Sequence, residues 1–191
     1  MSAEERTKWD ARYQAQGHAV REPSRFLVAV SDLLPHRGRV IDVGGGDGRN
    51  AIWLARRGLD VTVVDISAAG LALASEAARA AHVSLRTVCA DLETEPLPPG
   101  PWDVIVNVHF LLRSLFARFG SALAPTGSLV FAQPTMANLK YHDRPSRSYL
   151  LKNRELLGLL AGLAPVLYRE GWNEDGRHEA ELLARRSTQR L

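Results

Sequence analysis

The residues of this chain best suited to chemistry are three aspartates that each follow or end a predicted strand. Asp42 leads into a turn with four glycines within residues 44–48, and Asp65 and Asp91 accompany the next two strands. Glycines directly after a buried strand let the backbone turn tightly and let a ligand approach it closely. A carboxylate such as that of Asp65 has two acceptor oxygens, which can take both vicinal hydroxyls of a ribose. The pattern therefore predicts a nucleoside-containing ligand at the ends of these strands.

Three kinds of nucleotide site could be built on this turn, and the neighbouring residues distinguish between them. A P-loop needs a lysine followed by serine or threonine at the start of the helix, but Arg49 and Asn50 stand there. A dinucleotide site stays open, because residues 46–51 match the alanine-ending variant of its glycine motif. However, Asp42 and Asp47 would repel a pyrophosphate, which prefers bare N–H groups at a helix N-terminus. S-adenosylmethionine carries an ammonium and a sulfonium instead, so acids near the turn favour this cofactor.

The elements that would position these groups alternate between helices and strands along the chain. Apolar spacing and capping residues predict helices over 3–16, 23–34, 49–57, 68–81, 111–123 and 153–163. β-branched and apolar runs predict strands over 39–43, 60–65, 83–88, 102–108, 128–132, 166–172 and 178–185. This order implies parallel pairing with right-handed crossovers, and a turn at 173–176 closes a final hairpin. We predict an α/β protein with a single doubly wound, mostly parallel seven-stranded sheet and a C-terminal antiparallel β-hairpin.

With this pattern the chain resembles the class I S-adenosylmethionine-dependent methyltransferases over roughly residues 20–186. Three segments, 9–13, 48–50 and 53–55, are similar to the small bacterial branch that includes tellurite-resistance methyltransferases. One departure is Gly45, where many relatives carry cysteine. The motifs of the family, acid-x-Gly-x-Gly-x-Gly followed by a second and a third acid, stand here as Asp42, Gly44, Gly46 and Gly48, then Asp65 and Asp91.

The resemblance implies a Rossmann-like methyltransferase fold that binds S-adenosyl-L-methionine and releases S-adenosyl-L-homocysteine. Trp9, Arg12 and Tyr13 share one face of the first predicted helix, and we expect them to close over the bound cofactor. The other predicted cofactor-binding residues are Asp42, Gly44, Gly46, Gly48, Asn50, Asp65, Ile66, Asp91, Leu92 and Asn107.

Methyl transfer from a sulfonium is an in-line displacement, for which an enzyme supplies mainly alignment and exclusion of water. A base is needed only where the acceptor must lose a proton. His109, at the end of the fourth predicted strand, and Tyr141, in the polar segment after the fifth, are the predicted catalytic residues. Arg113, His142 and Arg144 are predicted to bind the acceptor, which we expect to be compact and either anionic or a soft nucleophile. No metal is expected, because the sequence has no helical i, i+4 histidine pair.

The overall composition indicates a globular chain with one domain. The 191 residues are 46% hydrophobic and 24% charged, with a net charge of +3 and a single cysteine, so no internal disulfide framework is possible. The N-terminus has no apolar signal sequence, and the longest nearly apolar stretch, residues 156–167, is too short to span a bilayer. We expect a cytoplasmic monomer or homodimer without a membrane segment. Residues 1–20 would form an N-terminal helix or lid, 21–186 the core and 187–191 a flexible tail.

A small-molecule methyl acceptor is the expected partner. The basic residues are scattered rather than gathered in a stripe with interleaved aromatics, which argues against nucleic acid. Three alternatives stay open: an NAD(P)-binding Rossmann oxidoreductase, a non-catalytic S-adenosylmethionine-binding protein, and an RNA methyltransferase. Equilibrium binding of the two cofactors separates the first from a methyltransferase, and methyl-transfer assays separate the other two.

Overall fold

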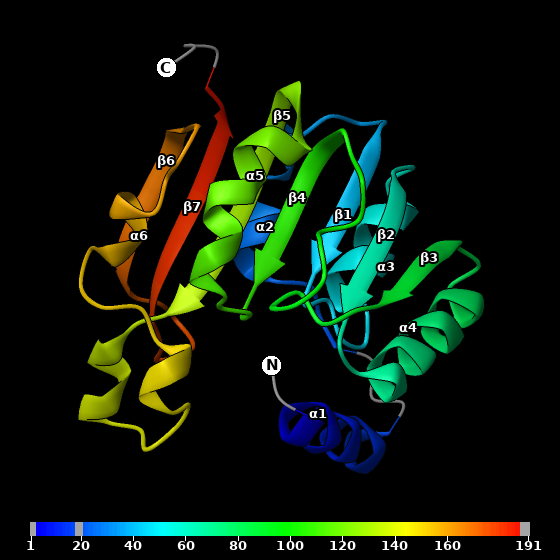
Figure 1. Ribbon diagram of the computed structural model, residues 1–191, viewed down its shortest axis with the longest axis horizontal. Helices are drawn as coiled ribbons and strands as arrows, with labels where there is room; N and C mark the ends of the chain where they lie inside the picture. The colour runs from blue at the N-terminus through cyan, green and yellow to red at the C-terminus, as the bar shows by residue number, and fades with distance from the viewer. Residues whose placement is uncertain (1–2, 18–20, 188–191) are drawn as a thin grey trace.

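A single seven-stranded sheet runs through the computed structural model, which describes residues 3–17 and 21–187 (Figure 1). Its strands are, in chain order, β1 (Arg39–Val43), β2 (Asp60–Asp65), β3 (Leu85–Cys89), β4 (Trp102–Val108), β5 (Leu123–Pro134), β6 (Leu163–Trp172) and β7 (His178–Arg186). They lie in the order β3-β2-β1-β4-β5-β7-β6. Strands β1 to β5 pair in parallel, and β7 lies antiparallel between β5 and β6. The predicted fold class is confirmed, whereas residues 188–191 of the predicted tail lie outside the described residues.

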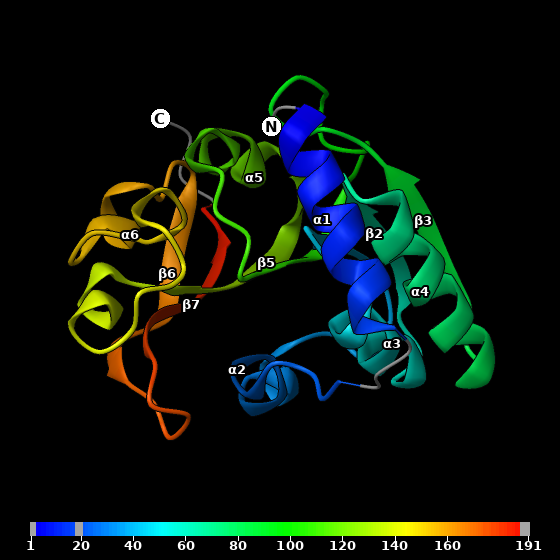
Figure 2. The same cartoon turned by 90° about the horizontal axis from the view of Figure 1, so that it is seen from below.

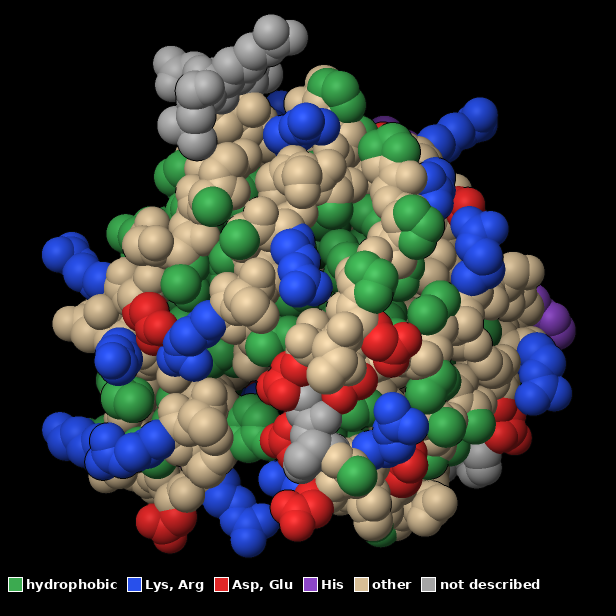
Figure 3. All heavy atoms as spheres, viewed as in Figure 1, with side chains coloured by type: hydrophobic (Ala, Val, Ile, Leu, Met, Phe, Trp, Pro, Cys, Tyr) green, Lys and Arg blue, Asp and Glu red, His purple; other side chains and the backbone are tan. Residues whose placement is uncertain are grey.

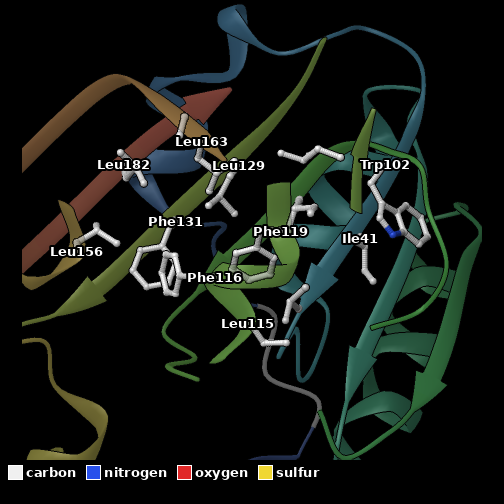
Figure 4. Packing of buried hydrophobic residues seen from close by; sticks show 14 of the residues in the cluster. Ile41, Trp102, Leu115, Phe116, Phe119, Leu129, Phe131, Leu156, Leu163 and Leu182 are labelled. Atoms are coloured by element: carbon white, nitrogen blue, oxygen red, sulfur yellow. The ribbon is translucent and has the colours of Figure 1, made fainter. Parts of the chain in front are cut away.

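The helices that cover the sheet are α2 (Arg25–Ala29), α3 (Arg49–Arg56), α4 (Ala68–Ala80) and α5 (Phe116–Ala122). On one face, Phe116 and Phe119 of α5 pack against each other and Phe116 also packs against Phe131, with ring centroids 5.4 and 5.0 Å apart (Figure 4). On the other face, Phe26 of α2 and Leu54 of α3 belong to a second buried cluster. Because both faces are covered, the central strands can be almost wholly apolar, as parallel sheets require.

Three predicted helices are shorter in the structure. The segment 23–34 is divided into α2 and the 3-10 helix η1 (Ser31–Leu33), because Val30 leaves helical geometry with φ −99° and ψ 3°. Of the predicted helix 153–163, only α6 (Glu155–Gly158) is helical in the structure. Arg154 before it has a left-handed φ of +56°, and glycines at its end weaken a helix. The third predicted helix, 111–123, starts with the 3-10 helix η2 (Arg113–Leu115) and becomes α-helical only in α5.

Strand β5 is longer than the sequence indicates, because it begins at Leu123 rather than at residue 128. Pro125 and Gly127 suggest a loop there. This stretch still pairs with β4, because the register between the two strands shifts between Trp102 and Val104. The long strand carries the chain from the far side of the molecule to the edge where the site lies.

The carboxyl ends of β1, β2, β4 and β5 meet at one edge of the sheet. Helix α1 (Ala3–Gln16) lies across this edge, and the segment that carries the 3-10 helices η3 (Met136–Lys140) and η4 (Arg147–Tyr149) lies on its other side (Figures 1 and 2). The strand order reverses between β1 and β4, which is where open α/β sheets bind their ligands. No helix in residues 3–17 or 21–187 is long and apolar enough to cross a membrane.

Candidate active site

A cavity of about 1550 Å³ opens at this edge of the sheet. Single ligand pockets usually measure about 300–1,000 Å³, so the cavity has room for a cofactor and a second molecule. Of the predicted site residues, those that line it are Trp9, Arg12, Tyr13, Gly44, Asn50, Asp65, Ile66, Leu92, His109, Tyr141, His142 and Arg144. Those that do not are Asp42, Gly46, Gly48, Asp91, Asn107 and Arg113.

The glycine turn after β1 has a backbone that other residues would strain. Gly44, Gly46 and Gly48 have φ values of +67°, +54° and +77°, in the left-handed region that favours glycine. A Cβ added to Gly46 would lie 1.9 Å from the Tyr13 hydroxyl oxygen, so the turn and α1 approach each other more closely than any side chain allows. The turn therefore needs glycine for packing as well as for ligand approach.

Asp65, at the end of β2, ties this turn in place. Its Oδ2 accepts a hydrogen bond from the Gly46 amide at 2.9 Å, and its Oδ1 accepts one from the Ser67 amide at 2.8 Å. Burial raises the pKa of the Asp65 carboxyl. Each oxygen has two lone pairs, so the carboxylate can still accept hydrogen bonds from a ligand in the cavity.

Three polar side chains near the carboxyl ends of β1, β4 and β5 have buried atoms without a hydrogen-bond partner. Within the described part of the chain these atoms are Oδ2 of Asp42, both amide atoms of Asn107, and Oε1 of Gln133. Orphaned buried polar groups are rare in native proteins and need an explanation. All three lie near the sheet edge that carries the cavity, and of the three Gln133 lines it. Gln133 was missed as a site residue; its place at the end of the fifth parallel strand was the available signal.

The Asp42 carboxyl is wholly buried, and this raises its pKa to about 7 despite the nearby Arg49. The ordinary value is 3.8, so between about pH 4 and 7 the folded chain holds a proton that the unfolded chain has released. Asp42 therefore contributes its full stabilisation at a pH below its pKa in the unfolded chain. This contribution is lost as the pH rises through its pKa in the folded chain.

We therefore expect Asp42 to lower the free energy of unfolding by roughly 1.4 kcal/mol per pH unit as pH rises across this window. Asp42→Asn should remove that slope, because the amide cannot ionise. Denaturant unfolding of both proteins between about pH 4 and 8 measures the difference. A difference in stability that stays constant across this range would contradict the assignment.

Helix α1 docks on the edge of the site through polar contacts. Asp10 accepts hydrogen bonds from the Ser67 hydroxyl at 2.6 Å and from the Ala69 amide at 3.1 Å, at the start of α4. Tyr13 is buried and stacks on Trp9 with ring centroids 6.0 Å apart. Arg12 lies over the Trp9 ring, 5.0 Å from its centroid. The face that carries the three predicted residues thus borders the cavity.

His109 follows β4 and meets two charged residues that the sequence analysis did not place in the site. Its Nε2 lies 2.8 Å from Oε1 of Glu179 on β7, and its Nδ1 lies 3.4 Å from a terminal nitrogen of Arg49. Burial acts to raise the pKa of Glu179, but the hydrogen bond from His109 holds it below its usual range. Burial and the neighbouring Arg21 lower the pKa of Arg49.

Arg113, which was predicted to bind the acceptor, does not line the cavity. Its guanidinium forms a two-point ion pair with Glu155, at 2.5 and 3.0 Å, and donates to the Leu150 carbonyl at 3.0 Å. It therefore joins η2 to the first residue of α6 and to Leu150 before that helix, outside the cavity. Asp91 is buried, and its Oδ1 accepts from the Glu93 amide at 3.0 Å, so the adjacent Leu92 is the residue that reaches the cavity.

The segment after β5 contributes the remaining predicted residues. Tyr141 is 64% exposed and packs on Trp172 of the hairpin with ring centroids 5.2 Å apart. The His142 Nε2 lies 3.3 Å from the Gly176 carbonyl oxygen. Arg144 forms no ion pair with any other described residue. Among the residues that the structure describes, no group of three His, Cys, Asp or Glu side chains is arranged to hold a metal ion.

Comparison with known proteins finds similarity to methyltransferases over about half of this chain. Residues 40–127 match the family model described as "Methyltransferase domain". An uncharacterized methyltransferase of Mycobacterium tuberculosis is 37% identical over 111 residues, which cover 54% of this chain and 55% of the relative. The tRNA 5-carboxymethoxyuridine methyltransferase of Escherichia coli is 33% identical over 115 residues, covering 52% of this chain and 41% of that enzyme. The chain thus spans about half the length of these relatives, or less.

A solved structure supports the fold over nearly the full chain. The TehB-like SAM-dependent methyltransferase from Corynebacterium glutamicum superimposes with a TM-score of 0.70 at 17% identity, covering 97% of this chain and all of that one. Together these matches confirm the resemblance that the glycine turn and the three aspartates indicated. S-adenosylmethionine is the cofactor of that class of proteins.

Proposed function

We propose that this chain transfers a methyl group from S-adenosylmethionine to a small-molecule acceptor, because residues 40–127 match a methyltransferase domain and the fold is similar to that of an S-adenosylmethionine-dependent methyltransferase. The observation that carries the proposal is the cluster of polar groups at the carboxyl edge of the sheet. Asp65 borders the cavity, and Asp42 and Asn107, which do not line it, carry buried polar atoms without a hydrogen-bond partner near the same edge of the sheet.

These residues suit the cofactor chemically. Asp65 has acceptor capacity left for ribose hydroxyls, and Asp42 is a buried acid whose ionised form a cationic ligand would stabilise. Asn107 offers both a donor and an acceptor at the end of β4. When bound, the cofactor supplies a methyl group on a positively charged sulfur. The residues of the chain align the acceptor with that methyl and exclude water.

The acceptor end of the cavity supports an anionic molecule. Arg144 and Arg177 border it, and neither forms an ion pair within the described residues. Arg49 also borders the cavity and forms no ion pair with a carboxylate of the described residues. These three cations take the place of Arg113, which Glu155 neutralises. We propose a compact acceptor that carries a carboxylate or a comparable anion.

An RNA acceptor is the alternative that the Escherichia coli relative raises. The cavity is bordered by α1 on one side and by the segment 134–149 on the other, which favours a compact molecule. On the face seen in Figure 3, the Lys and Arg side chains are spread among acidic and uncharged ones instead of forming a continuous basic stripe. On that face, the charges therefore lack the basic stripe with which proteins bind phosphate backbones.

Binding and transfer assays test the proposal. Calorimetry should show binding of S-adenosylhomocysteine and none of NAD or NADP. Radiolabelled S-adenosylmethionine should then label at least one member of a panel of carboxylates, phenols, thiols, amines, selenite and tellurite. Efficient labelling of tRNA with no small molecule labelled would overturn the small-acceptor proposal, and cofactor binding without any transfer would indicate a non-catalytic binding protein.

Arg144→Gln and Arg177→Gln should each raise the KM for an anionic acceptor by at least about tenfold and leave kcat nearly unchanged. This is the pattern of an interaction made equally in the ground state and the transition state. Arg185→Gln is the matched control, since Arg185 lies at the far end of β7 and away from the cavity. Steady-state kinetics with the best anionic acceptor of the panel provides the measurement. An unchanged KM in both cavity variants would contradict this anion site.

A further inference from the structure

His109 follows β4 and Glu179 lies in β7, far apart in the sequence, yet their side chains form a hydrogen-bonded pair. The Nε2–Oε1 distance is 2.8 Å, and the second carboxylate oxygen of Glu179 accepts from the Asn173 amide group at 3.1 Å. Glu179 is only 7% exposed. A buried carboxylate is costly unless it is paired and hydrogen-bonded, and here both oxygens have partners. The carboxylate is therefore held in a fixed orientation toward the imidazole.

The two neighbours of the imidazole require the same tautomer. A carboxylate only accepts hydrogen bonds, so the Nε2 that faces Glu179 must carry a proton. A guanidinium only donates, so the Nδ1 that faces Arg49 at 3.4 Å must present its lone pair. A proton on Nδ1 would instead place two donors against each other. His109 thus has its lone pair directed to the side where Arg49 borders the cavity.

The backbone of His109 is also held in an unusual conformation. Its φ is +62°, in the left-handed region that costs residues other than glycine roughly 1–2 kcal/mol. The His109 amide donates to the Ala132 carbonyl at 2.8 Å, which fixes this conformation beside β5. Strained residues of this kind collect at functional sites, where the surrounding structure maintains them.

We propose that Glu179 is a positioning residue that holds the Nδ1 lone pair of His109 ready to take a proton from a hydroxyl-bearing acceptor, beside the guanidinium of Arg49. This deepens the proposed methyl transfer and rests on it. The anionic group that Arg144 and Arg177 bind would be a second feature of the same acceptor. The reacting atom is then an oxygen rather than a soft nucleophile.

The proposed step balances as follows. When the acceptor binds, the Arg49 N–H turns from Nδ1 to the acceptor oxygen and frees the Nδ1 lone pair. The acceptor O–H proton then moves to Nδ1 of His109, and the imidazolium that forms is stabilised by the Glu179 carboxylate. The oxygen, held by Arg49, uses its electron pair to form a bond to the methyl carbon. The carbon–sulfur bond breaks, and its electron pair stays on the sulfur of S-adenosylhomocysteine. His109 afterwards releases the proton to solvent.

Glu181 supplies a matched control for Glu179. It lies two positions along the same strand, is 6% exposed, and forms an ion pair with Arg169 instead of His109. Glu181→Gln therefore removes an equally buried charge from β7 without touching the imidazole. Glu179→Gln, Glu179→Asp and Glu181→Gln should be compared in the full chain, with thermal unfolding to establish that each is folded.

The first measurement does not depend on an acceptor or on activity. The ¹⁵N chemical shifts of the His109 ring, assigned with a His109→Gln variant, report which nitrogen carries the proton. We expect a protonated Nε2 and an unprotonated Nδ1 in the wild type and in Glu181→Gln. In Glu179→Gln we expect a larger fraction of rings protonated on Nδ1, because the glutamine amide can donate to Nε2 as well as accept from it. A wild-type ring protonated on Nδ1, or a ring that Glu179→Gln leaves unchanged, would overturn the proposal.

The second measurement concerns turnover of a phenol or another hydroxyl-bearing member of the acceptor panel. Glu179→Gln should lower kcat at least about tenfold, since positioned proton transfer contributes on the order of 10²–10⁴ in rate. The affinity for S-adenosylhomocysteine should change less than about twofold, and Glu179→Asp should recover part of kcat. Equal losses in Glu179→Gln and Glu181→Gln would show a structural role only. Failure of S-adenosylhomocysteine to bind the wild type would instead refute the proposed function and leave the tautomer result standing.

Discussion

Asp65→Ala should weaken the binding of S-adenosylhomocysteine at least about tenfold. The carboxylate borders the cavity and retains lone pairs for the ribose hydroxyls. Each hydrogen bond to a charged group contributes about 1.5–3 kcal/mol, and about 1.4 kcal/mol corresponds to one decade of affinity. Isothermal titration calorimetry gives the dissociation constants of the variant and the wild type.

The same substitution should also destabilise the fold, because the amides of Gly46 and Ser67 lose their buried acceptors. Unsatisfied buried groups cost about 1–3 kcal/mol each. Asp60→Ala is the control, since Asp60 lies at the exposed start of the same strand and pairs with Arg86 at the surface. Asp65→Asn separates the two effects, because its side-chain oxygen can still accept one of the two amides. If Asp65→Ala and Asp65→Asn both bind the product as tightly as Asp60→Ala, the ribose assignment fails.

Gly46→Ala should have a comparable or larger effect on cofactor binding. The added methyl group would lie 1.9 Å from the Tyr13 hydroxyl oxygen, so either α1 or the turn must move. The left-handed φ of +54° adds a cost of roughly 1–2 kcal/mol for alanine. We expect at least about a tenfold loss of affinity for S-adenosylhomocysteine, because the turn and α1 both border the cavity.

Gly162→Ala is the matched control for this prediction. Gly162 also has a left-handed φ, +66°, but its Cβ would meet nothing closer than 3.8 Å, and it lies outside the cavity. It should therefore show the cost of backbone strain without the collision. Titration of S-adenosylhomocysteine into each variant, with thermal unfolding alongside, separates the two effects. Equal affinities in the two glycine variants would mean that the close approach of Tyr13 to the turn has no part in binding.

The charges at the glycine turn show how tertiary contacts alter the electrostatics that a sequence suggests. Asp47 stands between the glycines and looks like a second acid for a cationic ligand. In the structure both of its oxygens bind the Arg21 guanidinium at 2.6 Å, and Gln16 donates to one of them at 2.9 Å. Among the described residues, Asp42 and Asp65 are therefore the acids of this region that form no direct ion pair with an arginine.

Much of the fold could be predicted from the sequence because its causes are local. The apolar runs that end at Val43, Asp65 and Val108, each separated by helical segments, lead to parallel strands with right-handed crossovers. The Ser67 cap of α4 and the left-handed glycines of the turn depend on residues within a few positions. The position of Asp65 at the site follows from the same rule, since the carboxyl ends of parallel strands share one edge.

The acceptor end of the site was decided only by the tertiary structure. His109 and Glu179 are brought together by the antiparallel register of β7 on β5, which places Glu179 opposite Pro134. No local spacing encodes that register, because it depends on how the hairpin inserts beside the sheet. The sequence also does not show which partner a long side chain reaches. Arg113 was therefore expected in the cavity, whereas in the structure it pairs with Glu155. Strands and turns follow from neighbours along the chain, whereas the partners of charged side chains depend on the packing of distant segments.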